Sequence, residues 1–267
     1  MLYEMLFQTI EIIKIILTLI ILTLTSYMDL RTREVNDIIW VIYGSIGGTL
    51  TIIEFILGYI SILQILISTS TGIILGLALF YALGFGGADA KLIWTLGITH
   101  IINPMQTLGY TQPIIVNPIF IVTILINSIF ISISAIFYNL TKNIHWYLSG
   151  KKLFEGYEKT IPEKILLLLV AYKANKNQII KDKFTITVED EDEKGRRIKL
   201  IGHKKIDPRE VDFNKVEERV PHINKYETFW VEKPLPFLVF VMGGFIIALI
   251  FGDISIALVM NIFRRTI

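Results

Sequence analysis

The sequence predicts an all-α polytopic membrane protein of about six transmembrane helices, with a small α+β cytoplasmic insert before the last helix. The chain has 267 residues, of which 53% are hydrophobic and 19% are charged, whereas soluble domains average about 45–50% and about 25%. The charge is also segregated, because residues 141–234 contain 20 of the 26 Lys and Arg residues and 16 of the 24 Asp and Glu residues. One apolar part and one polar part in the same chain argue against intrinsic disorder and against a single soluble domain.

Six apolar stretches outside the polar segment are candidates to cross the bilayer, the fourth only marginally, since a crossing needs roughly 20 residues. They cover residues 6–27, 38–57, 62–83, 90–102, 114–140 and 235–252. We therefore expect a membrane domain with helices 1–5 in residues 1–140, a soluble insert in 141–234, and the sixth helix with a C-terminal tail in 235–267. Lys14 lies within the first stretch, where it can reach the membrane surface or pair with Glu11.

Basic residues in the short loops predict the orientation, because cytoplasmic loops carry the excess of Lys and Arg. The odd-numbered loops are basic and the even-numbered ones are not: the basic residues are Arg31 and Arg33 in the first loop, Lys91 in the third, and Lys142, Lys151 and Lys152 in the fifth. Loops one, three and five should then face the cytoplasm and the N-terminus the outside. Arg264 and Arg265 at the C-terminal end oppose this assignment.

The insert contains signals for one helix and one hairpin. Thr160, Pro162 and Glu163 form a capping-box pattern that predicts a helix running to about Lys173. Residues 184–188 and 196–201 alternate between polar and apolar side chains on either side of an acidic turn at 190–195, which predicts a β-hairpin. Residues 228–236 should be extended where the chain returns to the membrane.

Asp29 and Asp89 are the most informative acids. Asp29 ends the first predicted helix, and Asp89 begins the fourth, directly after a glycine-rich turn that includes Gly86 and Gly87. Singly, each has a structural explanation: Asp29 pairs with Arg33, and Asp89 caps its helix. At one membrane face, however, two carboxyl groups about 3 Å apart would share one proton. One could then activate a water as general base while the other acts as general acid.

Two motifs around these acids resemble a known family. Residues 86–89, Gly-Gly-Ala-Asp, resemble the Gly-x-Gly-Asp signature of membrane aspartyl proteases, with Ala88 in place of the second glycine. Asp29, a basic stretch and then Val35-Asn36 resemble the first motif of the type IV prepilin peptidases. The six-helix layout is similar too, and the archaeal preflagellin (prearchaellin) peptidases carry the same Gly-Ala-Asp version. The resemblance covers most of the membrane part, and the insert only loosely.

The resemblance implies an aspartyl endopeptidase that removes the short basic leader from archaellin or type IV pilin-like precursors at the cytoplasmic membrane face. Its catalytic pair would be Asp29 and Asp89, and we expect Gly86 and Gly87 to shape the loop that aims Asp89. Three acidic features could attract a basic leader: Glu34, Asp37 and the run 189–193. The simpler alternatives are that Asp37 caps the second helix and that the acidic run is a solvated hairpin tip.

Other classes are less well supported. The chain has no cysteine, its four histidines form no His-Glu-x-x-His pattern, and the net charge of +2 is too small to indicate nucleic acid; no cofactor or metal is expected. A transporter or channel subunit with acids as ion ligands stays an alternative, as does a non-enzymatic membrane scaffold. Glu54 should be interfacial, Asp253 should lie at the outer end of the last helix, and Gly243-Gly244 should permit close helix packing.

Overall fold

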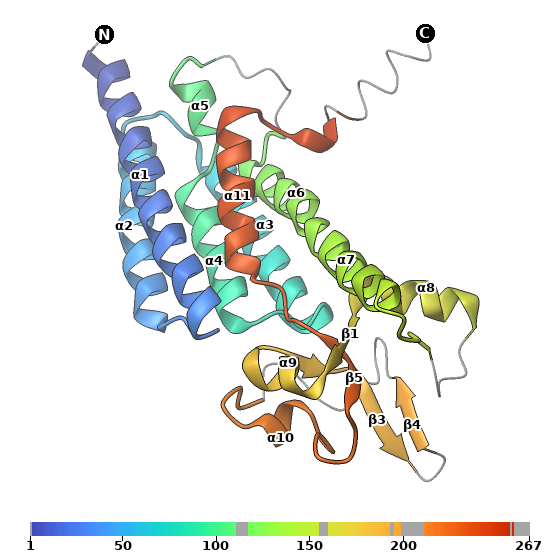
Figure 1. Ribbon diagram of the computed structural model, residues 1–267. Helices are drawn as coiled ribbons and strands as arrows, with labels where there is room; N and C mark the ends of the chain where they lie inside the picture. The colour runs from blue at the N-terminus through green and yellow to red at the C-terminus, as the bar shows by residue number, and fades with distance from the viewer. Residues whose placement is uncertain are drawn as a thin grey trace, which may run out of the picture. The chain divides into compact units, whose positions relative to one another are not determined.

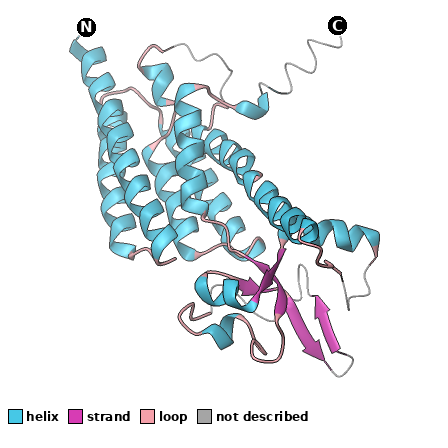
Figure 2. Ribbon diagram, in the orientation of Figure 1, coloured by secondary structure: helices cyan, strands magenta, loops and turns pink. Residues whose placement is uncertain are grey.

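The computed structural model describes residues 2–110, 117–154, 160–192, 195–198, 211–256 and 258, which form two compact units (Figures 1 and 2). Unit 1 comprises Met1–Ser132 and Pro236–Ile267, and unit 2 comprises Ile133–Leu235. The start of the fifth predicted stretch (114–116), the end of the second predicted strand (199–201), and Arg264 and Arg265 lie outside the described residues. The division into a membrane domain and a cytoplasmic insert stays a prediction.

Unit 1 is a bundle of antiparallel helices joined by short turns (Figure 1). Its elements are α1 (Leu2–Arg31), α2 (Asp37–Ile56), α3 (Ile62–Leu77) with the π-helical turn η1 (Ala78–Ala82), α4 (Gly87–Thr99), α5 (Pro104–Thr107), α6 (Phe120–Ser132) and α11 (Phe237–Ile250). Helix α4 packs against α2 and α3, and α11 packs against α1 and α6. The bundle thereby brings the C-terminal helix beside the N-terminal one.

Within the described residues, four helices are long and apolar enough to cross a membrane: Glu4–Arg31, Asp37–Ile56, Ile62–Ala82 and Phe120–Leu148. The other two predicted stretches do form helices, but α4 has 13 residues and α11 has 14. Each is shorter than the roughly 20 residues that a crossing needs. The helical membrane character is therefore found, whereas the count of six spans is not confirmed.

Close helix contacts in unit 1 depend on glycines. A Cβ atom on Gly97 of α4 would lie 3.0 Å from Cα of Gly72 on α3. A Cβ atom on Gly244 of α11 would lie 2.6 Å from the carbonyl oxygen of Ile124 on α6. Because no real side chain fits at these distances, the glycines allow the helix backbones to approach. The packing role predicted for Gly243-Gly244 is thus confirmed at Gly244.

Unit 2 is an α+β unit. It contains α7 (Ser134–Leu148), α8 (Ile161–Val170), β1 (Tyr172–Asn175), α9 (Lys176–Lys181), β2 (Ile186–Thr187), β3 (Glu189–Asp192), β4 (Gly195–Ile198), α10 (Val216–Arg219) and β5 (Thr228–Glu232). Strands β1, β5 and β2 form an antiparallel sheet in that order, and β3 pairs with β4 (Figure 2).

The sequence located the elements of unit 2 better than their ends and partners. The backbone N–H and the hydroxyl of Thr160 donate to Glu163 at 2.9 and 2.8 Å, which confirms the capping box. The helix ends at Val170 and not near Lys173, because Tyr172–Asn175 pair with β5 instead. A hairpin does form, between β3 and β4, but its first strand is the predicted acidic turn, and the strand predicted at 184–188 pairs with β5 instead. The extended segment predicted at 228–236 is confirmed in β5.

Candidate functional site

Asp29 lies in the last turn of α1, just before the chain leaves the helix. Arg33 follows with a positive φ of 61°, which ends the helix and returns its side chain toward α1. Its Nη1 atom lies 3.5 Å from Asp29 Oδ1, and the side chains are only 10% and 12% exposed. The pairing predicted between these residues is confirmed. It places a positive charge beside a largely buried carboxylate, where the charge favours the ionised form.

Asp89 is positioned by a glycine turn between η1 and α4. Gly84 has a φ of +71°, a conformation that side chains disfavour, and Gly86 then occupies the N-cap position of α4. The Gly86 N–H donates to Asp89 Oδ2 at 2.9 Å. Asp89 is therefore the third residue of the helix, whereas the sequence had predicted it to be the N-cap. The helix dipole still favours a negative charge there.

The loop-shaping role predicted for Gly86 and Gly87 stays a prediction. Neither residue is among those with positive φ, so the special backbone conformation of this turn lies at Gly84. A Cβ atom on Gly86 would lie 3.3 Å from Asp89 Oδ2, and one on Gly87 would lie 3.9 Å from the Phe80 ring. Of the two, only Gly86 has a tight relation to the carboxyl group of Asp89.

The C-terminal end of α1 and the N-terminal end of α4 lie at the same end of unit 1 (Figure 1), so the fold brings Asp29 and Asp89 together. Burial and the negative charge of Asp29 raise the pKa of Asp89 to about 7, while its hydrogen bond from Gly86 and the charge of Arg33 act in the opposite direction. Near neutral pH, Asp89 can consequently hold a proton that an ordinary aspartate would have lost. The pair has one group suited to donate a proton and one suited to accept it.

A third element adjoins this pair from the far end of the sequence. The backbone of Leu238, in the first turn of α11, interacts with Asp29. Next to it, the Phe237 ring packs edge-on against Phe85 of the glycine turn, with ring centroids 4.8 Å apart. Among the described residues, Asp29 Oδ2 is buried without a hydrogen-bond partner. Sequence reasoning missed Phe237 and Leu238 because only the folded bundle brings α11 beside α1.

The acidic residues expected to attract a basic leader differ in their exposure and in their ion pairs. Glu34 is exposed. Asp37 accepts a bond from Lys91 at 2.6 Å, and the N-cap of α2 is Asn36, whose side chain accepts the Ile38 N–H. The prediction that Asp37 caps this helix was therefore wrong by one residue. The ion pair ties the start of α2 to the start of α4, close to Asp89.

Two acids of the run 189–193, Glu189 and Glu191, have partners within unit 2. Glu189 pairs with Lys173 at 3.4 Å, and both side chains are 5% exposed. Glu191 pairs with Lys225 and accepts a bond from the Tyr226 hydroxyl. These two acids are thus neutralised within unit 2. Glu193, the last acid of the run, lies outside the described residues.

Two other predictions about acids have clear outcomes. Glu54, expected at the interface, is fully buried, because it pairs with Lys14 of α1 at 2.8 Å. Asp253 follows α11 as expected, but it is also fully buried, and its Oδ1 atom accepts bonds from Ser255 and from the Ile256 N–H. Across the described residues, no group of three or more His, Asp or Glu side chains could hold a metal ion.

Apolar helices that bring two carboxyl groups together at one end of a bundle have the arrangement expected of a membrane protease. Residues 16–136, which include Asp29 and Asp89, match the model of the Type IV leader peptidase family. Residues 163–254 match the model described as Archaeal Peptidase A24 C-terminus Type II.

Relatives match over nearly the whole chain. The preflagellin peptidase of Methanocaldococcus jannaschii is 27% identical over 249 residues, which cover 91% of this chain and 95% of the relative. The preflagellin peptidase of Methanococcus voltae is 25% identical over 251 residues, covering 90% and 95%. The chain is thus similar to type IV leader peptidases over residues 16–136 and to preflagellin peptidases over most of its length.

Proposed function

We propose that this protein is a membrane aspartyl endopeptidase that removes the short basic leader from archaellin or type IV pilin-like precursors at the cytoplasmic membrane face. The observation that carries the proposal is the electrostatic pairing of Asp29 with Asp89 at one end of unit 1, with Arg33 beside both. The relatives named as preflagellin peptidases support the substrate class. Four membrane-length helices support a multi-pass membrane location.

The two carboxyl groups have different tasks in the proposed reaction. The positive charge of Arg33 favours the ionised form of Asp29, so Asp29 takes a proton from a water molecule, and the water oxygen attacks the scissile carbonyl carbon. Asp89, which holds a proton near neutral pH, donates it to the carbonyl oxygen; when the tetrahedral intermediate collapses, Asp89 takes that proton back and Asp29 passes the proton from water to the leaving amine. No covalent intermediate forms, and neither a cysteine nor a cofactor takes part.

The surroundings of the pair fit a basic leader followed by an apolar helix. Glu34, three residues beyond the end of α1, is an exposed acid that can attract positive charge. The Phe85 and Phe237 rings supply an apolar contact beside the carboxyl groups. In the proposed complex the substrate helix stays in the bilayer, and its leader reaches the pair from the cytoplasmic side.

The test is cleavage of a leader-bearing archaellin or pilin-type precursor by the full chain in membranes, followed by gel shift. Asp29→Asn and Asp89→Asn should each reduce cleavage by at least about 10²–10⁴-fold, the usual contribution of a general acid or base. Asp212→Asn is the matched control, because it makes the same change at an exposed acid of unit 2 that pairs with Lys215. Cleavage that persists in both active-site variants would reject the proposal and favour an ion-binding or scaffold role.

A further inference from the structure

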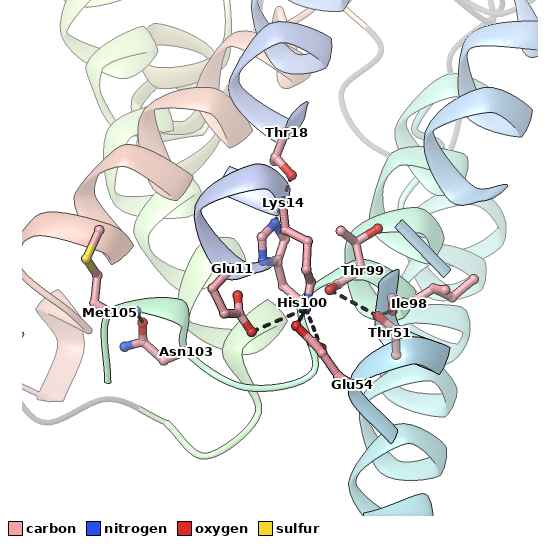
Figure 3. A network of polar contacts seen from close by, with 10 residues as sticks. All are labelled: Glu11, Lys14, Thr18, Thr51, Glu54, Ile98, Thr99, His100, Asn103 and Met105. Carbon is pink, nitrogen blue, oxygen red and sulfur yellow. Dashed lines mark hydrogen bonds and ion pairs between the residues drawn. The ribbon is translucent and has the colours of Figure 1, made fainter. Parts of the chain in front are cut away.

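A second cluster of ionisable side chains lies in unit 1, away from Asp29 and Asp89. Lys14 is about 22 Å from Asp29 along α1, since a helix rises 1.5 Å per residue. Figure 3 shows Lys14 between Glu11 of the same helix and Glu54 of α2. All three residues are fully buried. We call Glu11, Lys14 and Glu54 the buried triad.

The buried triad has one acid too many. Lys14 supplies one positive charge, and the two glutamates would supply two negative ones. An uncompensated charge buried among apolar helices costs several kcal/mol, so such groups are paired or neutralised. His100 does not supply the missing positive charge, because its burial and the positive charge of Lys14 both disfavour the protonated imidazole. The remaining way to balance the site is a proton on one of the glutamates.

The contacts identify which glutamate carries that proton. Lys14 Nζ donates to both oxygens of Glu54, at 3.0 and 2.8 Å, but only to Oε1 of Glu11, at 3.3 Å. No described donor bonds to Oε2 of Glu11, which is buried. Because an ionised carboxylate needs bonds to both oxygens in an apolar interior, the glutamate with the unbonded oxygen, Glu11, is the one that holds the proton.

We propose that Glu11 and Glu54 bind one proton between them beside Lys14, with Glu11 as the protonated member, and that this proton site is separate from the Asp29–Asp89 pair. Its titratable surroundings are His100 after α4 and Tyr43 of α2, which both bond to Thr18 at 2.8 Å. Asp253, after α11, caps its own turn. The site joins α1 to α2, and Thr18 joins α1 to the end of α4.

The proton makes folding pH-dependent with a definite sign. In the folded chain Glu11 is protonated, whereas an exposed glutamate in the unfolded chain is ionised at neutral pH. The folded state therefore binds more protons, and stability falls as pH rises. Loss of the proton leaves two ionised glutamates facing one lysine, which weakens the contact between α1 and α2.

Infrared spectroscopy of the full chain in lipid nanodiscs tests the site. The background is Asp29→Asn with Asp89→Asn, so that the candidate active site contributes no carboxylic acid signal. In this background we expect a carboxylic acid C=O band at neutral pH that disappears in Glu11→Gln and persists in the control Asp212→Asn. A band that Glu11→Gln leaves unchanged, or no such band at all, would overturn the proposal.

Thermal unfolding from about pH 4.5, near the pKa of an exposed glutamate, up to alkaline pH is the second measurement. The parent should lose stability as pH rises, and Glu11→Gln, which resembles the protonated side chain, should lose much less. Glu54→Gln should unfold at a lower temperature than Glu11→Gln, because it removes the acid that takes two bonds from Lys14. Equal pH dependence in the parent and Glu11→Gln, or a lower unfolding temperature for Glu11→Gln than for Glu54→Gln, would contradict the assignment.

Discussion

The two ends of unit 1 hold similar side chains under opposite conditions. At one end, Asp89 is partly exposed and the Asp29 side chain is 12% exposed, and Glu34, a few residues after Asp29, is exposed. At the other, Glu11 and Glu54 are fully buried around Lys14. A hydrolytic carboxyl group must meet water and substrate, whereas a sealed one can only stabilise a helix contact or keep a proton. Access, and not residue type, therefore separates the candidate active site from the buried triad.

The largest expected effect on stability comes from removing the cation of the buried triad. Lys14→Met leaves two buried glutamates without a partner, and breaking such a pair costs about 3–5 kcal/mol. We expect this loss in the free energy of unfolding, measured by denaturant titration in detergent micelles. Lys215→Met removes an exposed lysine that pairs with Glu218 and should change stability little. If Lys14→Met were as stable as the parent, the triad would not be a structural contact.

A smaller loss is expected where α3 and α4 touch between the two ends. Gly97→Ala places a Cβ atom 3.0 Å from the Gly72 backbone, and overpacking of this kind costs about 1–3 kcal/mol. Gly48→Ala is the matched control, because its nearest neighbour would be a flexible Ile98 methyl group at 3.4 Å. Thermal unfolding compares the two. An unfolding temperature for Gly97→Ala at or above that of Gly48→Ala would show that the helices can separate without cost.

The sequence predicted the candidate site better than the buried triad. Asp29 and Asp89 lie next to loops whose basic residues predict a common membrane face, so a topology count was enough to expect them close together. Glu54 lies 40 residues from Lys14, and nothing near it in the chain shows that a lysine faces it. Pairing across helices depends on their rotation, which composition does not determine.

Unit 2 shows the same limit for strands. The alternation at 184–188 correctly indicated extended backbone, and the structure places Ile186–Thr187 in a strand. The partner of that strand is β5, about 45 residues further on, and not the next polar run. Alternation identifies which face of a strand is apolar, but it contains no information about which strand it pairs with.

The smallest expected effect concerns how Arg33 tunes the pair. Arg33→Met should lower cleavage about tenfold at neutral pH, since a hydrogen bond to a charged group contributes about 1.5 kcal/mol. Its loss disfavours the ionised form of Asp29 and raises the pKa of Asp89, which Arg33 lowers. Both limbs of the pH–rate profile should then move to higher pH. Arg33→Lys should restore them in part, and the exposed neighbour Arg31→Met should leave them in place.

If both limbs of the pH–rate profile stayed in place in Arg33→Met, Arg33 would not influence the protonation of Asp29 or Asp89. The ion pair with Asp29 would then have only a structural role at the C-terminal end of α1. In that case a tenfold loss of activity would have to come from the altered turn, and it should also appear as a raised KM.

The most direct test of the proposed acid pair is a double-mutant cycle on precursor cleavage with Asp29→Asn, Asp89→Asn and the double variant. Residues that act as one catalytic unit are strongly non-additive. We therefore expect each single variant to lose nearly as much kcat as the double variant. Losses that multiply, or a single variant that keeps near-parent cleavage, would contradict joint action by the two carboxyl groups.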